Sequence, residues 1–592
     1  MATVLDASIE SFRYPRSSES VLKPIRLKVE EGEFVVITGP AGSGKTTLCH
    51  CLTGVIPKFI AGEYKGHVTI GGQRVDQIPL PAVAPLAGFL LQAPENQLFN
   101  PSVIEDVAFG PENLRFSRPE IQRAALGALR FVGMEDYAHR LSDALSGGQT
   151  QRVVLSCILA MDPPLFILDQ PAAELDPSGR RELYDNIYQL NIRAHKTILV
   201  VEDRLSDVVA YATRIILMVD GAIVRDEEPQ AFFQSEAVAA CGIRVPDVVR
   251  LHYLLQGRSV QSPRVFLTPR EVGQNFGPAL EQAAGASSCT ETSGSPGASL
   301  PVSRAGNTAL RQPESAAIEV HYVHYLYPPG TWALRGVSIE IREGEFVALI
   351  GENGAGKTTL AKQLIGLLRP TRGRILVRGR DATKMSIAQL ADQVGFLFQN
   401  PDHQIFSESV FDEVAFGLKI RRVPRVEIES RVAEMLDRVG LAAYRNHHPY
   451  LLSRGQRQRL GFACVLVRRP PILVVDEPST GLDYAETIDV FDLLSEYRRQ
   501  GGTVVIITHD MDMVVRHAER SIVMAGGMIY VDTATARLQE HFDMLHNASI
   551  RLPDIYYLVE ELKLPKSITS LEEIADRISA SWHASTSKGK TA

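Results

Sequence analysis

Two segments of the chain have the residue types and spacing that bind the phosphates of a nucleotide: GPAGSGKT at 39–46 and GENGAGKT at 351–358. Each follows an apolar run typical of a strand and precedes a segment that suits a helix, which is the context of a phosphate-binding loop. Glycines let the backbone wrap around phosphates, the helix start offers unpaired N–H donors, the lysine neutralises charge and the threonine can ligate Mg²⁺. A glycine-rich turn is the structural alternative, and two loops of the same pattern argue against it. The candidate ligands are Gly39, Gly42, Gly44, Lys45, Thr46 and Thr47, and Gly351, Gly354, Gly356, Lys357, Thr358 and Thr359.

Two aspartates stand where a magnesium ion would need them. The runs LFILD and ILVVD place four apolar residues, which suit a buried parallel strand, before Asp169 and Asp476. An aspartate at the carboxyl end of such a strand can hold Mg²⁺ through its water shell. Apolar runs that end in aspartate are often purely structural. Their position after a phosphate loop nevertheless predicts ATP and Mg²⁺ as the cofactors.

These motifs belong to an internal repeat. SFRYP near residue 11 corresponds to HYLYP near 324, and LLQAPENQLF corresponds to LFQNPDHQIF. From Gln92 and Gln399 to Arg244 and Arg551, corresponding landmarks are 307 residues apart, which predicts two copies of one fold without net insertion.

The repeat sets the predicted domains, which are residues 3–243 and 318–549. A short extension and a linker occupy 244–317, and a C-terminal extension with a disordered tail occupies 550–592. The linker itself, at about 256–313, is rich in Ala, Ser and Gly and is expected to be flexible. Ser570 and Glu573 predict the start of a short terminal helix, and the last ten residues are expected to fray.

Composition narrows the class of protein. A chain of 592 residues with 45% hydrophobic and 22% charged residues is globular and too long for one core. Its net charge of -7 and pI of about 6.1 oppose binding to nucleic acid. The six cysteines lack the spacing of a metal site or a disulfide framework, which favours a reducing compartment. No apolar run is long enough to span a bilayer and the N-terminus does not resemble a secretion signal, so we expect neither secretion nor a membrane span.

A further motif lies between each phosphate loop and its aspartate: LSGGQTQR at 145–152 and LSRGQRQR at 452–459. With these residues the chain resembles the ATP-binding cassette (ABC) ATPases over nearly all of each copy. The resemblance implies an α/β fold of two P-loop cassettes, each with a RecA-like core, an antiparallel β subdomain and a helical insert before the signature. It also implies head-to-tail pairing, in which the signature of one cassette faces the phosphate loop of the other; the linker favours an intramolecular pair. The signature residues are Ser146, Gly147, Gly148 and Gln149, and Ser453, Gly455 and Gln456.

The resemblance assigns a complete catalytic set to the second copy. Glu477 follows the magnesium aspartate and is the general base for the attacking water. His509 contacts the γ-phosphate, Gln399 senses Mg²⁺ and water, and Asp483 belongs to the loop that crosses to the other cassette. The implied metal ligands are Thr46, Gln92 and Asp169 in the first copy and Thr358, Gln399 and Asp476 in the second.

The first copy departs from this set. Gln170 follows the magnesium aspartate, and an amide is not basic enough to take a proton from water. Counting along the repeat makes Glu202 the residue of the first copy that corresponds to His509. A carboxylate there would repel a γ-phosphate unless it turns away, is protonated or is held by a cation such as Arg204.

The second copy departs in its signature, where Arg454 replaces a glycine. In a head-to-tail pair, this arginine and the two departures of the first copy fall in one composite site. We therefore expect that site to bind ATP and hold the pair closed while the other site turns over. Neutral drift at a tolerant site is the alternative.

Two tyrosines are candidates for adenine recognition. Tyr14 and Tyr327 each precede a proline and lie about 30 residues before the phosphate-loop lysine, where the family stacks an aromatic ring on the base. Packing at a strand edge is the structural alternative.

Motifs present in both copies point to one kind of ABC protein. QAPENQLF and QNPDHQIF are followed by EDVAFG and DEVAFG, and the cassettes end in GIRVPDV and SIRLPDI. These segments resemble the energy-coupling factor (ECF) transporter ATPases, which drive uptake through a transmembrane coupling subunit and a substrate-binding membrane subunit. The resemblance implies a transport-coupled ATP hydrolase, peripheral at the cytoplasmic face of the membrane.

Two other classes remain as alternatives. A soluble twin-cassette protein of translation or DNA repair is disfavoured because no coiled-coil insertion, basic helical linker or cysteine cluster is present. The ATPase of a conventional ABC importer or exporter is harder to distinguish by these residues.

Overall fold

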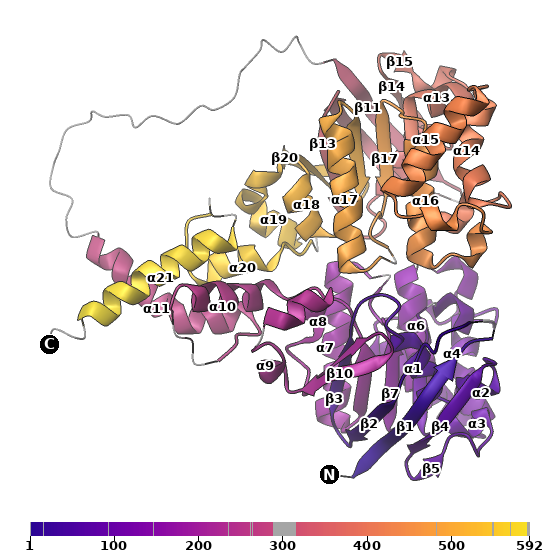
Figure 1. Cartoon of the computed structure of the whole chain (residues 1–592), viewed down its shortest axis with the longest axis vertical. Coiled ribbons are helices and arrows are strands. Elements are labelled where there is room, and N and C mark those ends of the chain that lie inside the picture. Colours follow the sequence, from indigo (N-terminus) through magenta and orange to yellow (C-terminus); the bar gives the residue numbers. More distant parts are fainter. Residues whose placement is uncertain are drawn as a thin grey trace. The chain divides into compact units, whose positions relative to one another are not determined.

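The chain folds into two compact units, Met1–Glu271 and Val272–Ala592. The structure, a computed structural model, describes residues 2–15, 17–92, 94–145, 147–173, 175–234, 236–260, 262, 264–287, 315–328, 330–480, 482–547, 550–566, 568 and 570–588. Each unit contains one antiparallel sheet and one mainly parallel sheet with helices packed on it (Figure 1). The predicted α/β fold of two similar cassettes is confirmed.

The parallel sheet of the first unit has the strand order β10-β9-β3-β8-β7-β6. Its central strands are completely buried and are apolar except for one polar residue at an end of each, which suits a sheet covered on both faces. The antiparallel sheet has the order β2-β1-β4-β5. The strands are β1 Thr3–Arg13, β2 Ile25–Glu30, β3 Phe34–Thr38, β4 Glu63–Ile70, β5 Gln73–Arg74, β6 Ala87–Leu90, β7 Leu165–Asp169, β8 Thr197–Val201, β9 Arg214–Val219 and β10 Ala222–Glu227.

The second unit repeats this architecture, with a mainly parallel sheet of order β16-β17-β18-β13-β19-β20 and an antiparallel sheet of order β12-β11-β14-β15. Its strands are β11 Ala316–Tyr327, β12 Thr331–Arg342, β13 Phe346–Gly351, β14 Arg372–Val377, β15 Arg380–Asp381, β16 Val394–Leu397, β17 Ile472–Asp476, β18 Thr503–Ile507, β19 Arg520–Ala525 and β20 Met528–Ala534.

The helices include the insert that was predicted between each glutamine and its signature, made of α4 and α5 in the first unit and α14 and α15 in the second. Up to α10 they are α1 Lys45–Leu52, α2 Val55–Lys58, α3 Leu80–Val83, α4 Val103–Asn113, α5 Arg118–Phe131, α6 Gly147–Leu159, α7 Pro177–Ala194, α8 Leu205–Val208, α9 Pro229–Phe232 and α10 Asp247–Gly257. The others are α11 Pro269–Ser287, α12 Lys357–Leu364, α13 Ile387–Gln393, α14 Val410–Ile420, α15 Arg425–Arg438, α16 Arg454–Leu466, α17 Tyr484–Arg499, α18 Met511–His517, α19 Phe542–Asn547, α20 Asp554–Glu561 and α21 Leu571–Lys588. None of the helices in the described ranges is both long and apolar enough to cross a membrane.

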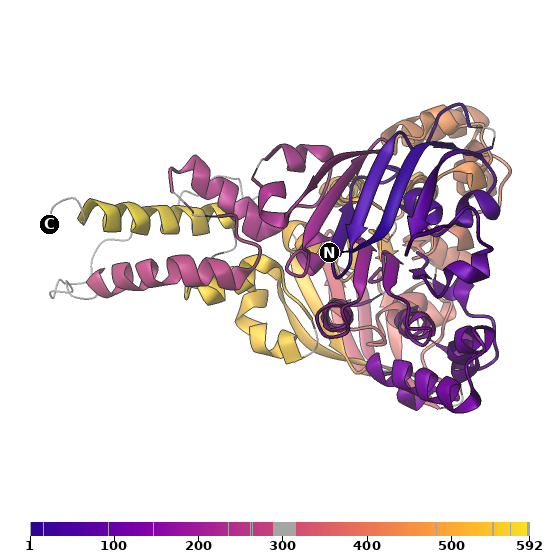
Figure 2. The same cartoon turned by 90° about the horizontal axis from the view of Figure 1, so that it is seen from below.

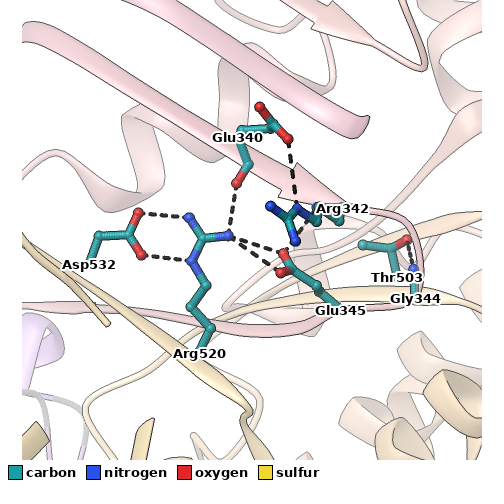
Figure 3. A network of polar contacts seen from close by, with 7 residues as sticks. All are labelled: Glu340, Arg342, Gly344, Glu345, Thr503, Arg520 and Asp532. Atoms are coloured by element: carbon teal, nitrogen blue, oxygen red, sulfur yellow. Dashed lines mark hydrogen bonds and ion pairs between the residues drawn. The ribbon is translucent and has the colours of Figure 1, made fainter. Parts of the chain in front are cut away.

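A mostly buried arginine ties the two sheets of the second unit together (Figure 3). Arg520 on β19 pairs with Asp532 on β20 at 2.6 Å and with Glu345, just before β13, at 3.2 Å. It also donates to the backbone oxygen of Glu340 on β12 at 2.9 Å. Arg214 forms the corresponding ion pairs in the first unit. Because such forked, charge-assisted bonds fix geometry, this network sets the antiparallel sheet against the strand that leads into the phosphate loop.

Helix α11 corrects the sequence analysis. Residues 256–313 were expected to be a flexible linker, but residues 269–287 form a helix, and its start is capped by Thr268 and Glu271, each of which accepts a hydrogen bond from the backbone N–H of the other. The rest of that linker, from 288 onwards, lies outside the described residues. At the other end of the chain, α21 runs to Lys588, further than the short helix that was predicted.

Helices α11 and α21 lie side by side (Figures 1 and 2). Phe276 on α11 is 1% exposed and its ring centre lies 6.0 Å from that of Trp582 on α21. The hydroxyl of Ser581 donates to the backbone oxygen of Ala279 at 2.8 Å. Apolar burial, supplied by the far end of the chain, therefore explains why this segment is helical.

Truncating Phe276 tests this packing. We expect Phe276→Ala to lower the free energy of unfolding by about 3 kcal/mol, because a large buried ring leaves a cavity between the helices. Urea titration followed by tryptophan fluorescence measures the change. Val426→Ala, at a position 84% exposed, is the control and should stay within about 0.5 kcal/mol of the parent. An equal, small effect of both variants would show that α11 does not depend on this contact.

Candidate nucleotide sites

The phosphate loop of the first unit connects β3 to α1. Gly39 and Gly44 have positive φ angles of 152° and 93°. A Cβ atom on Gly39 would lie 2.1 Å from the backbone oxygen of Met218, so only glycine fits there. Lys45 is 7% exposed and donates to the backbone oxygens of Gly39 and Pro40 at 2.6 and 3.0 Å. The loop is therefore folded back over its own lysine.

The second unit has the same loop between β13 and α12. Gly351 and Gly356 have φ angles of 155° and 96°. Lys357 donates to the backbone oxygens of Gly351 and Glu352, both at 2.8 Å. The loop glycines Gly42 and Gly354 also have positive φ, so both sequence-predicted loops have the backbone that their glycines indicated.

The two predicted magnesium aspartates end β7 and β17, inside the parallel sheets. Asp169 is 1% and Asp476 3% exposed. Both carboxylate oxygens of Asp169 and one of Asp476 are buried without a hydrogen bond in the part of the chain that the structure describes. Burial raises the pKa of each carboxyl to about 6, an effect that the hydroxyl of Thr46 or Thr358 opposes.

An unsatisfied carboxylate beside a threonine hydroxyl and a lysine fits Mg²⁺, which prefers oxygen ligands. Asp169 and Asp476, with Thr46 and Thr358, would hold the ion directly or through water. Bound there, the ion would neutralise charge on the nucleotide phosphates.

The residue after each aspartate has an unusual backbone. Gln170 and Glu477 have φ angles of 51° and 49°, in the left-handed region that residues other than glycine rarely adopt. Each donates its N–H to the end of the neighbouring strand, Gln170 to Val201 and Glu477 to Ile507. Such strain is common at functional positions. Both units therefore aim this side chain in the same way, although one is an amide and the other a carboxylate.

In the second unit, Glu477 lies beside a histidine. The Oε2 atom of Glu477 is 3.0 Å from Nδ1 of His509, and the Glu477 residue is 9% exposed. Gln399 follows the adjacent strand β16 and is exposed. The structure thus brings together Lys357, Asp476, Glu477 and His509, which were proposed as one set, and places Gln399 just after the neighbouring strand.

The strand registers correct the assignment of Glu202. Asp169 pairs with Val201, and Asp476 pairs with Ile507, so Glu202 corresponds to Thr508 and the next residue, Asp203, corresponds to His509. Equivalent contacts at the start of these strands support the same alignment. Thr197, which begins β8, accepts the N–H of Gly32, and Thr503, which begins β18, accepts the N–H of Gly344 (Figure 3). The prediction that Glu202 replaces the histidine is therefore wrong.

The shift arises in the preceding helix. Helix α7 has 18 residues whereas α17 has 16, and the first unit carries one residue more between the helix start and the strand. Corresponding residues of the two units are therefore one position closer together in the sequence at this strand. The separation returns to 307 residues by Arg244 and Arg551. The motif residues that were used to count along the repeat lie on either side of this segment, so their constant separation did not reveal the change.

Glu202 has a structural role. Its carboxylate is 7% exposed, accepts a hydrogen bond from the Tyr184 hydroxyl, and accepts the backbone N–H groups of Asp203 and Arg204 at 2.9 and 3.0 Å. Burial raises the pKa of this carboxyl above its usual value, and the hydrogen bond from Tyr184 opposes that shift. Thr508 does the same with one N–H, that of Asp510, at 3.0 Å. Both side chains fix the turn after the strand.

Asp203 faces the phosphate loop of the first unit. Its Oδ1 is 3.2 Å from Nζ of Lys45, and its Oδ2 accepts a hydrogen bond from the amide of Gln170 at 2.8 Å. Gln170 in turn accepts from the amide of Gln92 at 2.8 Å. Sequence reasoning missed Asp203, and the matching strands TILVV and TVVII were the signal that could have found it.

The signature residues stand at the start of a helix in each unit. Ser146 lies outside the described residues, while Gly147, Gly148 and Gln149 begin α6. In the second unit the Ser453 hydroxyl accepts the N–H of Gln456 at 3.2 Å, and Gln456 bonds back to the Ser453 N–H. Gly455 is buried and Arg454 is exposed. The helix start that the signature chemistry needs is present.

Both candidate adenine-binding tyrosines lie beside their phosphate loops. The hydroxyl of Tyr14 is 3.1 Å from that of Thr47, and the hydroxyl of Tyr327 is 3.4 Å from that of Thr359. Each ring also makes an edge contact with a second aromatic residue of its strand segment. Both rings are partly exposed, and Tyr14 also packs against the core of the first unit, so adenine recognition stays a prediction.

Comparisons with known proteins agree with this geometry. The family model for the ABC transporter matches residues 22–173 and 334–480. The chain belongs to the ABC transporter family.

Relatives of similar length carry the same designation. A protein of Caldanaerobacter subterraneus subsp. tengcongensis, named "Putative ABC transporter ATP-binding protein", is 35% identical over 95% of this chain and 97% of its own. A protein of Methanosarcina mazei with the same designation is 37% identical over 89% of this chain and 88% of its own. The solved structure of CbiO1 from Clostridium perfringens, described as part of the ABC transporter complex CbiONQ, is 35% identical, covers 42% of this chain and all of its own, and has a TM-score of 0.37. The two matches of the family model and the two relatives show that the chain is an ABC ATPase with two cassettes.

Each cassette of this ABC ATPase also exposes a pair of phenylalanines, which sequence reasoning did not single out. The ring centres of Phe99 and Phe109 lie 4.7 Å apart, and those of Phe406 and Phe416 lie 4.6 Å apart. In each pair one ring comes from the loop after the glutamine and is 64% or 60% exposed. The other comes from the VAFG segment of α4 or α14 and is 43% or 41% exposed.

Buried acids hold these loops in place. Asp106, 4% exposed, accepts the N–H groups of Phe99 and Asn100 at 3.0 and 2.9 Å. Glu413 does the same for Phe406 and Ser407. The repeated EDVAFG and DEVAFG motifs therefore supply both the second ring and the acid that positions the first.

Proposed function

We propose that this ABC ATPase is the energy-coupling subunit of an ECF-type transporter, and that ATP turnover takes place in its second cassette. The observation that carries the assignment of turnover is the contact between Glu477 and His509, where the first cassette has Gln170 and Asp203. A carboxylate can accept a proton from the attacking water, whereas an amide cannot. The head-to-tail pairing of the two cassettes, expected from the family, is part of the proposal.

The proposed complex includes a transmembrane coupling subunit and a substrate-binding membrane subunit, with this chain peripheral at the cytoplasmic face. The paired motifs after Gln92 and Gln399 support the ECF type. The exposed phenylalanine pairs support an apolar docking partner, because ordered aromatic rings held out of the core favour a protein contact. One pair in each cassette suits a partner that engages both.

The docking surface can be tested by removing the exposed rings. We expect the double variant Phe99→Ser, Phe406→Ser to recover about tenfold less membrane protein when the tagged chain is purified from detergent-solubilised membranes, since aromatic anchors dominate such contacts. Its ATPase activity without membrane partners should be unchanged. Val426→Ser, at an exposed apolar position on the other helix of the insert, α15, is the matched control.

The same purification separates the alternatives. Recovery of a coupling subunit and a substrate-binding subunit with the parent chain supports the ECF type, and recovery of a conventional permease would assign it to another ABC transporter. Recovery with ribosomes or DNA, and with no membrane protein, would contradict a transport role.

A further inference from the structure

We infer that the nucleotide site of the first cassette prefers a nucleoside diphosphate, because Asp203 competes with the γ-phosphate of ATP for Lys45. This inference rests on the proposed function in one respect, namely that nucleotide binds at the phosphate loop. It revises the expectation from the sequence that this cassette holds ATP.

Both oxygens of the Asp203 carboxylate contact other residues of the site. One oxygen lies 3.2 Å from the Lys45 ammonium, and the other accepts the Gln170 amide at 2.8 Å. Lys45 also donates to two backbone oxygens of its own loop. A terminal phosphate that approached this lysine would meet a negative charge already in place.

At the position that corresponds to Asp203, the second cassette has a side chain that can donate a hydrogen bond. There, His509 offers a ring that can donate to a γ-phosphate, and its neighbour is the carboxylate of Glu477. Asp203 can only accept hydrogen bonds when ionised. The two cassettes therefore differ in the sign of the interaction with a third phosphate, whereas both phosphate loops can bind the first two.

The position of Asp203 is fixed by its backbone. Glu202, buried against Tyr184, accepts the N–H groups of Asp203 and Arg204 and holds the turn. The side chain of Asp203 is 36% exposed, so solvent and Mg²⁺ screen its repulsion of the phosphate. We therefore expect a preference for ADP over ATP on the order of tenfold rather than exclusion of ATP.

Nucleotide binding to the full chain tests the inference without a measurement of turnover. Lys357→Ala is introduced to weaken binding at the second cassette, so that calorimetric titration reports one nucleotide per chain. In this background we expect MgADP to bind about tenfold more tightly than MgATP. Adding Asp203→Asn, which keeps the size and the contact with Gln170, should bring the two dissociation constants to within about twofold, mainly by tightening ATP. Asp203→His, the residue type of the second cassette, should shift the ratio in the same direction.

Asp136→Asn is the matched control, because it removes the same charge at an exposed position of the first unit. It should leave the ratio of dissociation constants unchanged. Equal affinities for ADP and ATP in the Lys357→Ala background would overturn the inference, as would a ratio that Asp203→Asn does not move. A chain that binds neither nucleotide would contradict the proposed function itself.

Discussion

Replacement of Glu477 by glutamine is expected to reduce steady-state ATP hydrolysis by the full chain about 10²-fold to 10⁴-fold, the usual contribution of a positioned general base. The carboxylate lies 3.0 Å from His509 and follows Asp476, the candidate magnesium ligand, so the substitution removes the proposed proton acceptor while the side-chain shape stays nearly the same. The positive φ angle of Gln170 shows that glutamine is accommodated at this kind of turn. Release of inorganic phosphate at saturating MgATP is the measurement.

Gln170→Ala provides the comparison in the first cassette. Because an amide takes no proton from water, its loss should leave most of the hydrolysis, within about threefold of the parent. The hydrogen bonds that Gln170 makes with Gln92 and Asp203 are lost in this variant, so a change in nucleotide affinity without a matching loss of turnover is consistent with the assignment. Equal losses in Glu477→Gln and Gln170→Ala would refute the division of labour between the cassettes.

The sequence was sufficient for features that are encoded locally. The phosphate loops could be predicted because a glycine at Gly39 or Gly351, where any Cβ would meet a backbone oxygen, leaves a visible pattern. The buried strands that end at Asp169 and Asp476 were equally clear, since a strand covered on both faces shows as a continuous apolar run, here of four residues before the aspartate. In these cases one segment contains both the signal and its physical cause.

Features that depend on distant segments were missed. The Ala, Ser and Gly around helix α11 are typical of a linker, and its partners on α21 lie about 300 residues further along the chain. Asp203 was missed because one extra residue near α7 is balanced by a later change. A count between landmarks cannot detect such a pair of changes, whereas hydrogen bonds between strands do. The ion pair of Asp203 with Lys45 is likewise a property of the folded chain.

Lys357→Ala is expected to reduce ATP hydrolysis at least about 10²-fold, in the range found when one electrostatic contact to a transition state is removed. Lys357 is 7% exposed, at the start of α12, and its ammonium is held at 2.8 Å from two loop oxygens, so it is already aligned with the incoming phosphates.

The same substitution at Lys45 also removes a phosphate contact, but from the first cassette. There Asp203 already opposes the terminal phosphate, and no carboxylate follows Asp169, the candidate magnesium ligand. We therefore expect Lys45→Ala to lower the maximal rate less than about fivefold, because charge that does not stabilise the reacting transition state contributes little to turnover. Measurement of the rate over a range of MgATP concentrations separates a lower maximal rate from weaker binding. If Lys45→Ala abolished turnover as completely as Lys357→Ala, hydrolysis would have to depend equally on both cassettes.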